Sequence, residues 1–153
     1  MTIQNFLKKS VFLGLVLSST SFAADTKCIF RLVKNTCWDN YSATVTIIKA
    51  HNLQEIGSGT VPKNQQQSNI SFPCALGEPI SLRATFSPAF WEGTAEKKYM
   101  TKRVWDIPLH LPEKTQKWEM TACFPDDFQS VPLPPTMGTN CHCEPPQDIS
   151  ADK

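Results

Sequence analysis

The sequence predicts an all-β protein, an antiparallel and immunoglobulin-like β-sandwich of about seven or eight short strands that disulfides hold together. Three observations support this fold class. Apolar and polar residues alternate in several short runs, turn-forming residues separate these runs, and no stretch has a convincing helical period. Six cysteines follow residue 23, and an even number after an export signal is typical of a disulfide framework. A β-barrel is the alternative architecture.

Residues 1–23 have the three parts of a secretory signal peptide. Lys8 and Lys9 supply the positive region, and a short apolar run follows at 11–17. Small residues at 21 and 23 predict cleavage after Ala23. Because the apolar run is far shorter than the roughly 20 residues of a spanning helix, we expect an exported soluble protein rather than a membrane anchor.

We expect three segments in this chain: the signal peptide at 1–23, a β-sandwich domain at 24–125 and a proline-rich tail at 126–153. Removing the signal peptide would leave 13 basic and 14 acidic residues, a net charge of about −1 without long runs of either sign. A nucleic-acid binder would have a basic stripe, and an electrostatic membrane binder would have a basic cluster. We therefore expect no nucleic acid and no membrane insertion. The expected location is the periplasm, with secretion into the medium as the alternative.

The alternation of apolar residues places the strands. We expect them at Ile29–Val33, Ala43–Ile48, a strand closed by Val61-Pro62, Ile70–Cys74, Ile80–Phe86, Tyr99–Ile107 and Trp118–Phe124. The first two would form a hairpin across the polar turn Lys34–Asn40. Gly57-Ser58-Gly59 would lie in or near a bulge, and the mixed faces of Tyr99–Ile107 indicate a bulge or burial on both sides.

Geometry limits how the six cysteines, at 28, 37, 74, 123, 141 and 143, can pair. In the expected hairpin, Cys28 and Cys37 lie at opposite ends, beyond the roughly 7 Å limit for bridged Cα atoms. A ring between Cys141 and Cys143 would be strained. We therefore expect one tail cysteine to pair with Cys28 or Cys37, the other with Cys74 or Cys123, and the remaining two with each other. Cys123 falls on the polar face of its strand, so its partner should come from a covering segment such as the tail.

Candidate chemistry in the sequence is sparse. Cys141-His142-Cys143 offers soft ligands for zinc or copper, but no second ligand pair stands at a recognisable spacing. Structural disulfides explain the cysteines better, and we expect no metal and no cofactor. The sequence has no Gly-x-Ser-x-Gly elbow, and we interpret Asp126-Asp127 as a solvated turn. We therefore expect a protein that is not an enzyme.

Phe90 and Trp91 are the candidate binding residues. They form a large apolar pair in the loop Ser87–Ala95, and aromatic residues dominate interface hot spots. Burial in the core is the alternative for each of them. Trp38 is better explained as a lid on the core than as a ligand-stacking ring. The proline-rich segment Val131–Pro135 must be extended, either as a docking ligand or as a connection that returns the tail cysteines to the sheet.

Four stretches, CIFRLVKNTCWDNYSATVTI, TVPKNQQ, ATFSPAFWEG and ACFPDDFQSVPLPP followed by CHC, resemble a small family of bacterial periplasmic proteins. These are the EirA-like proteins associated with the Dot/Icm (type IVB) secretion system of intracellular pathogens. The resemblance covers nearly the whole chain after residue 23. It implies a soluble periplasmic accessory factor of effector translocation and virulence, which acts by protein–protein contact with apparatus subunits and has no catalytic residues. A homodimer is a further expectation. The competing interpretation is a secreted binding module or effector that meets a host ligand.

Overall fold

Eight strands and one short helix form the domain, as described by a computed structural model for residues 26–135, 138 and 140–144. The predicted signal peptide lies outside the described residues. The strands are β1 Thr26–Lys34, β2 Ser42–Lys49, β3 Glu55–Val61, β4 Gln67–Cys74, β5 Pro79–Ser87, β6 Tyr99–Met100, β7 Trp105–Asp106 and β8 Trp118–Phe124, and the 3₁₀ helix η1 spans Thr36–Trp38. None of the described helices is long and apolar enough to cross a membrane.

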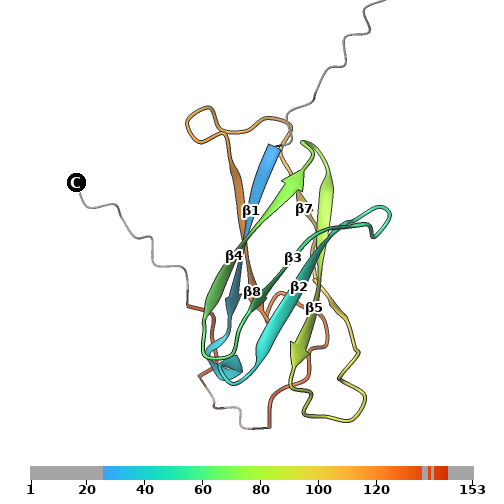
Figure 1. Cartoon of the computed structure of the whole chain (residues 1–153), viewed down its shortest axis with the longest axis vertical. Helices are drawn as coiled ribbons and strands as arrows, with labels where there is room; N and C mark the ends of the chain where they lie inside the picture. Colours follow the sequence, from blue (N-terminus) through green and yellow to red (C-terminus); the bar gives the residue numbers. More distant parts are fainter. Residues whose placement is uncertain (1–25, 136–137, 139, 145–153) are drawn as a thin grey trace, which may run out of the picture.

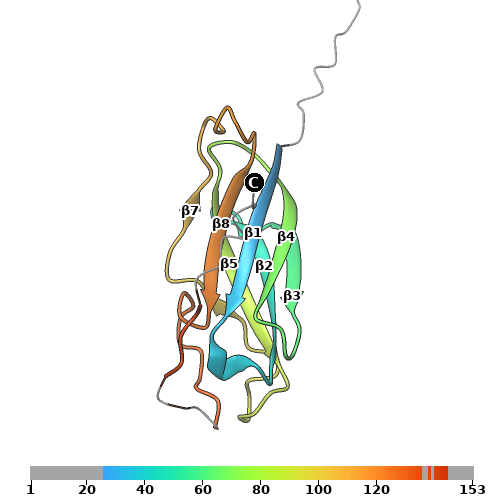
Figure 2. The same cartoon turned by 90° about the vertical axis from the view of Figure 1, so that its left-hand side faces the viewer.

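The strands form two sheets that face each other (Figure 1). The first sheet has the order β4-β1-β8, and the second has the order β3-β2-β5-β6, with β7 also paired to β5. Figure 2 shows the first sheet in front of the second. Every strand pair is antiparallel except β1 and β8, which run in parallel with Cys28 opposite Trp118 and Lys34 opposite Phe124. The predicted all-β sandwich is confirmed.

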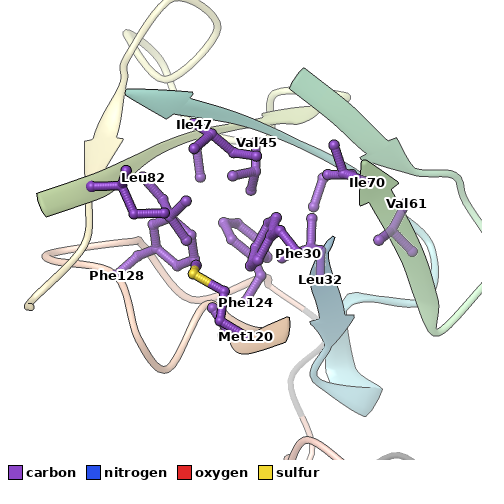
Figure 3. Packing of buried hydrophobic residues seen from close by; sticks show 14 of the residues in the cluster. Phe30, Leu32, Val45, Ile47, Val61, Ile70, Leu82, Met120, Phe124 and Phe128 are labelled. Atoms are coloured by element: carbon purple, nitrogen blue, oxygen red, sulfur yellow. The ribbon is translucent and has the colours of Figure 1, made fainter. Parts of the chain in front are cut away.

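The core lies between the sheets, because each strand directs alternate side chains inward. Phe30 and Leu32 of β1 face Val45 and Ile47 of β2, and all four are buried (Figure 3). The other labelled members of the cluster come from β3, β4, β5, β8 and the segment after β8: Val61, Ile70, Leu82, Met120, Phe124 and Phe128.

The predicted hairpin between the first two strands is wrong. β1 pairs with β4 and β8, whereas β2 pairs with β3 and β5 in the opposite sheet. The segment between them is turn-like only at its end, 39–40, because Lys34 is the last residue of β1 and is fully buried, and η1 follows it. Asn35 then caps η1 by accepting a hydrogen bond from the Cys37 amide at 3.0 Å. The connection therefore crosses from one sheet to the other instead of turning back.

The predicted strand Tyr99–Ile107 is two short strands, β6 and β7, separated by four residues. Arg83 lies opposite Met100, and Ile80 lies opposite Trp105. The four residues 101–104 therefore lie opposite only two residues of β5, 81 and 82. This is the predicted bulge, and it is large enough to break the strand. The Thr101 hydroxyl lies 2.9 Å from the Ser81 hydroxyl and accepts the Leu82 amide at 3.2 Å, where a continuous ladder would run.

Two glycines of β3 let the two sheets approach each other at one side of the sandwich. A Cβ at Gly57 would lie 2.8 Å from Cβ of Phe72, and a Cβ at Gly59 would lie 2.3 Å from Cγ1 of Ile70, both on β4. Any larger residue would push β3 and β4 apart. The register with β2 also shifts beside Gly57, between Ile47 and Ile48, which confirms a bulge near the glycines.

Candidate docking surface

A cluster of aromatic side chains fills one end of the sandwich. Trp38 is 1% exposed, and its ring meets Phe86 edge-on with centroids 5.0 Å apart and Phe124 at 4.7 Å. The η1 turn places Trp38 there, because the Asn35 cap fixes the backbone just before it. The interpretation of Trp38 as a lid on the core is confirmed.

The structure separates the two predicted binding residues. Phe90 is half-buried and belongs to the aromatic cluster, where its ring stacks on Phe86 at 4.9 Å and meets Tyr41 edge-on at 5.1 Å. Trp91 is 52% exposed, with its ring 6.1 Å from that of Phe90. The Thr94 hydroxyl donates a 2.7 Å hydrogen bond to the Trp91 carbonyl and so fixes the loop. Phe90 thus anchors the loop, and Trp91 projects from it.

The proline-rich segment lies against the same loop. The Trp91 indole Nε1–H donates a hydrogen bond to the Leu133 carbonyl at 3.2 Å, and Leu133 is itself 58% exposed. Val131 packs on the core and Pro134 is buried, so the segment is seated at both sides of Leu133. Figure 1 shows the loop after β5 and this segment at one end of the sandwich. We name the exposed surface of these two residues the Trp91–Leu133 face.

Two of the three disulfides fasten the tail. We name the described residues between Asp126 and Glu144 the strap. Cys37–Cys141 ties the strap to η1, Cys123–Cys143 ties it to β8, and Cys28–Cys74 joins β1 to β4. This connectivity follows the predicted pattern, and the partner of Cys123 comes from the tail as expected. Three disulfides are consistent with export into an oxidising compartment.

The strap cysteines are paired in disulfides. Among the described residues, the only cluster of three potential metal ligands that lie close together is Cys123, Asp126 and Cys143. Two of its members share a disulfide, and a disulfide sulfur is not the thiolate that zinc or copper binds. The two aspartates lie in the predicted turn, at 125–127, with Asp126 exposed. Their carboxylates also accept hydrogen bonds: Asp127 accepts the Cys123 amide at 2.7 Å, and Asn35 donates to the Asp126 carboxylate at 3.4 Å. They hold the start of the strap.

Two open hollows lie elsewhere on the surface. One of about 560 Å³ is lined by Lys114, Thr115, Lys117 and Glu119 beside β8, and one of about 340 Å³ is lined by Lys27, Ser71, Phe72 and Pro73. Neither lining joins a nucleophile to a histidine or pairs two carboxylates, the arrangements that hydrolytic chemistry needs. The Trp91–Leu133 face is therefore the better candidate site.

Lys34 is a buried charge that the sequence pattern did not reveal. Its ammonium donates to the Tyr41 carbonyl at 2.6 Å and the Pro62 carbonyl at 2.9 Å, joining the ends of β2 and β3. Burial lowers the pKa of Lys34 below its ordinary value of 10.5, and the negative charge of Asp39 offsets part of this effect. Lys34 therefore stabilises the end of the sandwich that holds the aromatic cluster.

The lowered pKa of Lys34 gives stability a measurable pH dependence. Between the lowered pKa and 10.5 the unfolded chain binds more protons than the folded one, so the free energy of unfolding rises with pH. We expect this rise to be absent in Lys34→Met, which keeps the aliphatic stem. Urea unfolding of the native protein and of Lys34→Met, from pH 7 upward, measures the two free energies of unfolding. If these differ by the same amount at every pH, the prediction is contradicted. Burial raises the pKa of Tyr99, an opposite effect that both proteins share.

Sequence reasoning missed the contact between Trp91 and Leu133, because 42 residues separate the two and no local pattern reports such a distance. The only available signal was that two apolar segments, Phe90-Trp91 after Pro88 and Leu133 between Pro132 and Pro134, lay outside the alternating strands. Comparisons of this chain with protein-family models, with curated proteins and with solved structures find no match.

Proposed function

We propose that this protein is a non-enzymatic accessory factor of the periplasm, which supports a type IVB secretion system by binding other proteins through the Trp91–Leu133 face. The docking role rests on one observation. Trp91 and Leu133 are both exposed and lie side by side, on a loop and a strap that are held in place by the rest of the domain. Exposed apolar groups that lie together mark interaction sites more often than isolated ones do. The link to type IVB secretion depends on the resemblance described above.

The Trp91–Leu133 face lies on a loop and a strap that are both held rigidly, and this favours docking there. Phe90 anchors the loop in the aromatic cluster, and the strap is held by two disulfides. A side chain that is fixed before binding loses little conformational entropy when a partner covers it. Tryptophan also buries a large area with few rotatable bonds, which is why it dominates hot spots. Trp91 therefore suits the centre of an interface.

We expect Trp91→Ala to abolish partner capture while the melting temperature changes little, because half of the ring faces solvent. The measurement is crosslinking in periplasm followed by mass spectrometry of the captured proteins. Leu53→Ala is the matched control, because Leu53 is also exposed, at 58%, but lies at the other end of the sandwich. It follows the end of β2 that pairs with the start of β5, whereas the loop containing Trp91 follows the other end of β5, at Ser87. The proposal is supported if secretion-apparatus subunits are captured by the native protein and by Leu53→Ala but not by Trp91→Ala. Equal capture by the native protein and both variants would contradict it.

Fractionation tests the location separately. Retention in the periplasm supports the accessory role. Accumulation in the medium would instead support the competing role, that of a secreted module for a host ligand.

A further inference from the structure

The three disulfides differ sharply in access to solvent. Cys28 is fully buried and Cys74 is 9% exposed, so their bridge lies within the core. Each of the four cysteines in the two strap bridges is half-exposed. Thiol–disulfide exchange requires the attacking sulfur to approach a bridge sulfur directly. The strap bridges are accessible to such an attack in the folded protein, and the core bridge is not.

A carboxylate distinguishes the two strap bridges from each other. Oδ2 of Asp126 lies 3.1 Å from Sγ of Cys123, and the Asn35 amide holds that carboxylate in place. Among the described residues, the polar neighbour of the other bridge is the Gly138 carbonyl oxygen, 4.0 Å from Sγ of Cys37 and 3.1 Å from Sγ of Cys141. A negative charge beside a sulfur repels an incoming thiolate and disfavours a departing one. Cys123–Cys143 is therefore the more protected of the two.

Apart from its bridges, the described end of the strap, residues 140–144, makes few contacts with the rest of the described chain. The Thr36 amide donates to the His142 carbonyl at 3.1 Å, and Sγ of Cys143 lies 3.7 Å from the Val33 carbonyl. Val33 points to the outer face of β1 beside Cys123, yet it is only 4% exposed. These contacts are too few to hold the end of the strap once both bridges open, whereas the start of the strap, where Phe128 and Pro134 are buried, the two sheets and the core bridge would stay in place.

From these observations we infer that the two strap bridges are a redox modification site for a dithiol reductant, which opens Cys37–Cys141 first and Cys123–Cys143 second. A thiolate of the reductant attacks one bridge sulfur, and the other cysteine leaves as a thiolate that takes up a proton. The second thiol of the reductant then resolves the mixed disulfide. The bridge ends as two cysteine thiols and the reductant ends as a disulfide, so that two electrons pass to the protein at each bridge.

Opening both bridges frees the end of the strap, so that Leu133 keeps its place beside Trp91 only through the packing of Val131 and Pro134, the Trp91 hydrogen bond and the pairing of the start of the strap with 100–102. If the Trp91–Leu133 face is the docking surface, docking weakens on reduction and recovers on oxidation. This consequence rests on the proposed function, whereas the order of bridge opening does not.

The test is stepwise reduction of the full exported chain with dithiothreitol, trapping with iodoacetamide, and peptide mapping of the labelled cysteines. We expect a species labelled at Cys37 and Cys141, then one labelled also at Cys123 and Cys143, both with the far-ultraviolet dichroism of the native protein. Hydrogen exchange of the peptide 129–144 should rise sharply in the second species. Simultaneous loss of all three bridges, or early labelling of Cys28 and Cys74, would overturn the inference.

Two variants sharpen the test. Asp126→Asn should speed the opening of Cys123–Cys143 several-fold and leave Cys37–Cys141 unchanged; no change in either rate would refute the protective role of the carboxylate. A variant with all four strap cysteines replaced by serine should keep the melting transition of a folded domain but capture less of its partner. If the bridges open in the expected order while this variant captures as much partner as the native protein, the link between the strap bridges and docking fails and the redox site stands.

Discussion

Replacement of Trp38 by alanine is expected to lower the free energy of unfolding by about 3–5 kcal/mol, the usual cost of deleting a large buried aromatic side chain. Trp38 lies against four aromatic rings, those of Tyr41, Phe86, Phe90 and Phe124, so a cavity at its place cannot be filled by the movement of one neighbour. The bulky side chains around it are themselves fixed by the two sheets. Urea unfolding of the oxidised protein, followed by far-ultraviolet dichroism, measures the loss.

Trp91→Ala is the control for this prediction, because it removes the same side chain from a half-exposed position of the same cluster. We expect it to cost under about 1 kcal/mol, as substitutions at exposed positions usually do. Equal losses for the two variants would mean that Trp91 supports the core as much as Trp38 does. The Trp91–Leu133 face would then be a structural feature and not a docking surface.

The double variant Cys28→Ala/Cys74→Ala has the second large expected effect, a loss of about 4 kcal/mol. The bridge spans a sequence separation of 46, and closing a loop of that size in the unfolded chain accounts for this value. The bridge also ties β1 to β4 at the end of their pairing, where Thr26 stands opposite Cys74. The midpoint of urea unfolding without reductant measures the loss.

The matched comparison is Cys37→Ser/Cys141→Ser. Its sequence separation is 104, and loop closure alone predicts the larger effect for this bridge. We expect the smaller effect, because the strap can detach while the sandwich stays folded. A greater loss for this variant than for the Cys28–Cys74 variant would show that the strap unfolds together with the domain.

The fold class could be predicted because alternation of apolar residues is a local signal of a half-buried strand. The strands with which a given strand pairs are not a local property of the sequence. β1 pairs with β4 and β8, whose residues lie far along the chain, and the alternating pattern of Ile29–Val33 is the same whatever strand lies beside it. The hairpin was therefore an assumption about proximity in sequence.

The disulfide pattern survived this error for a physical reason. Cys28 lies near the start of β1 and Cys37 lies in η1 just beyond its end, so the length of the strand keeps them apart whichever strands flank β1. The candidate site was predicted less well. The loop containing Phe90 and Trp91 was identified by its composition, but which of the two points outward depends on the aromatic cluster that Trp38, Tyr41 and Phe86 complete from other parts of the chain.

The position of β1 between β4 and β8 has a consequence for the order of events during synthesis. The chain emerges with its N-terminus first, so β1 must wait for the last strand, Trp118–Phe124, before the first sheet is complete. During that wait Cys37 is the nearest thiol to Cys28, although its proper partner is Cys74. No native bridge joins two cysteines that are neighbours in the sequence. A chain oxidised in order of emergence would be mispaired at every bridge, so native pairing requires either that folding precede oxidation or that the wrong bridges be reshuffled.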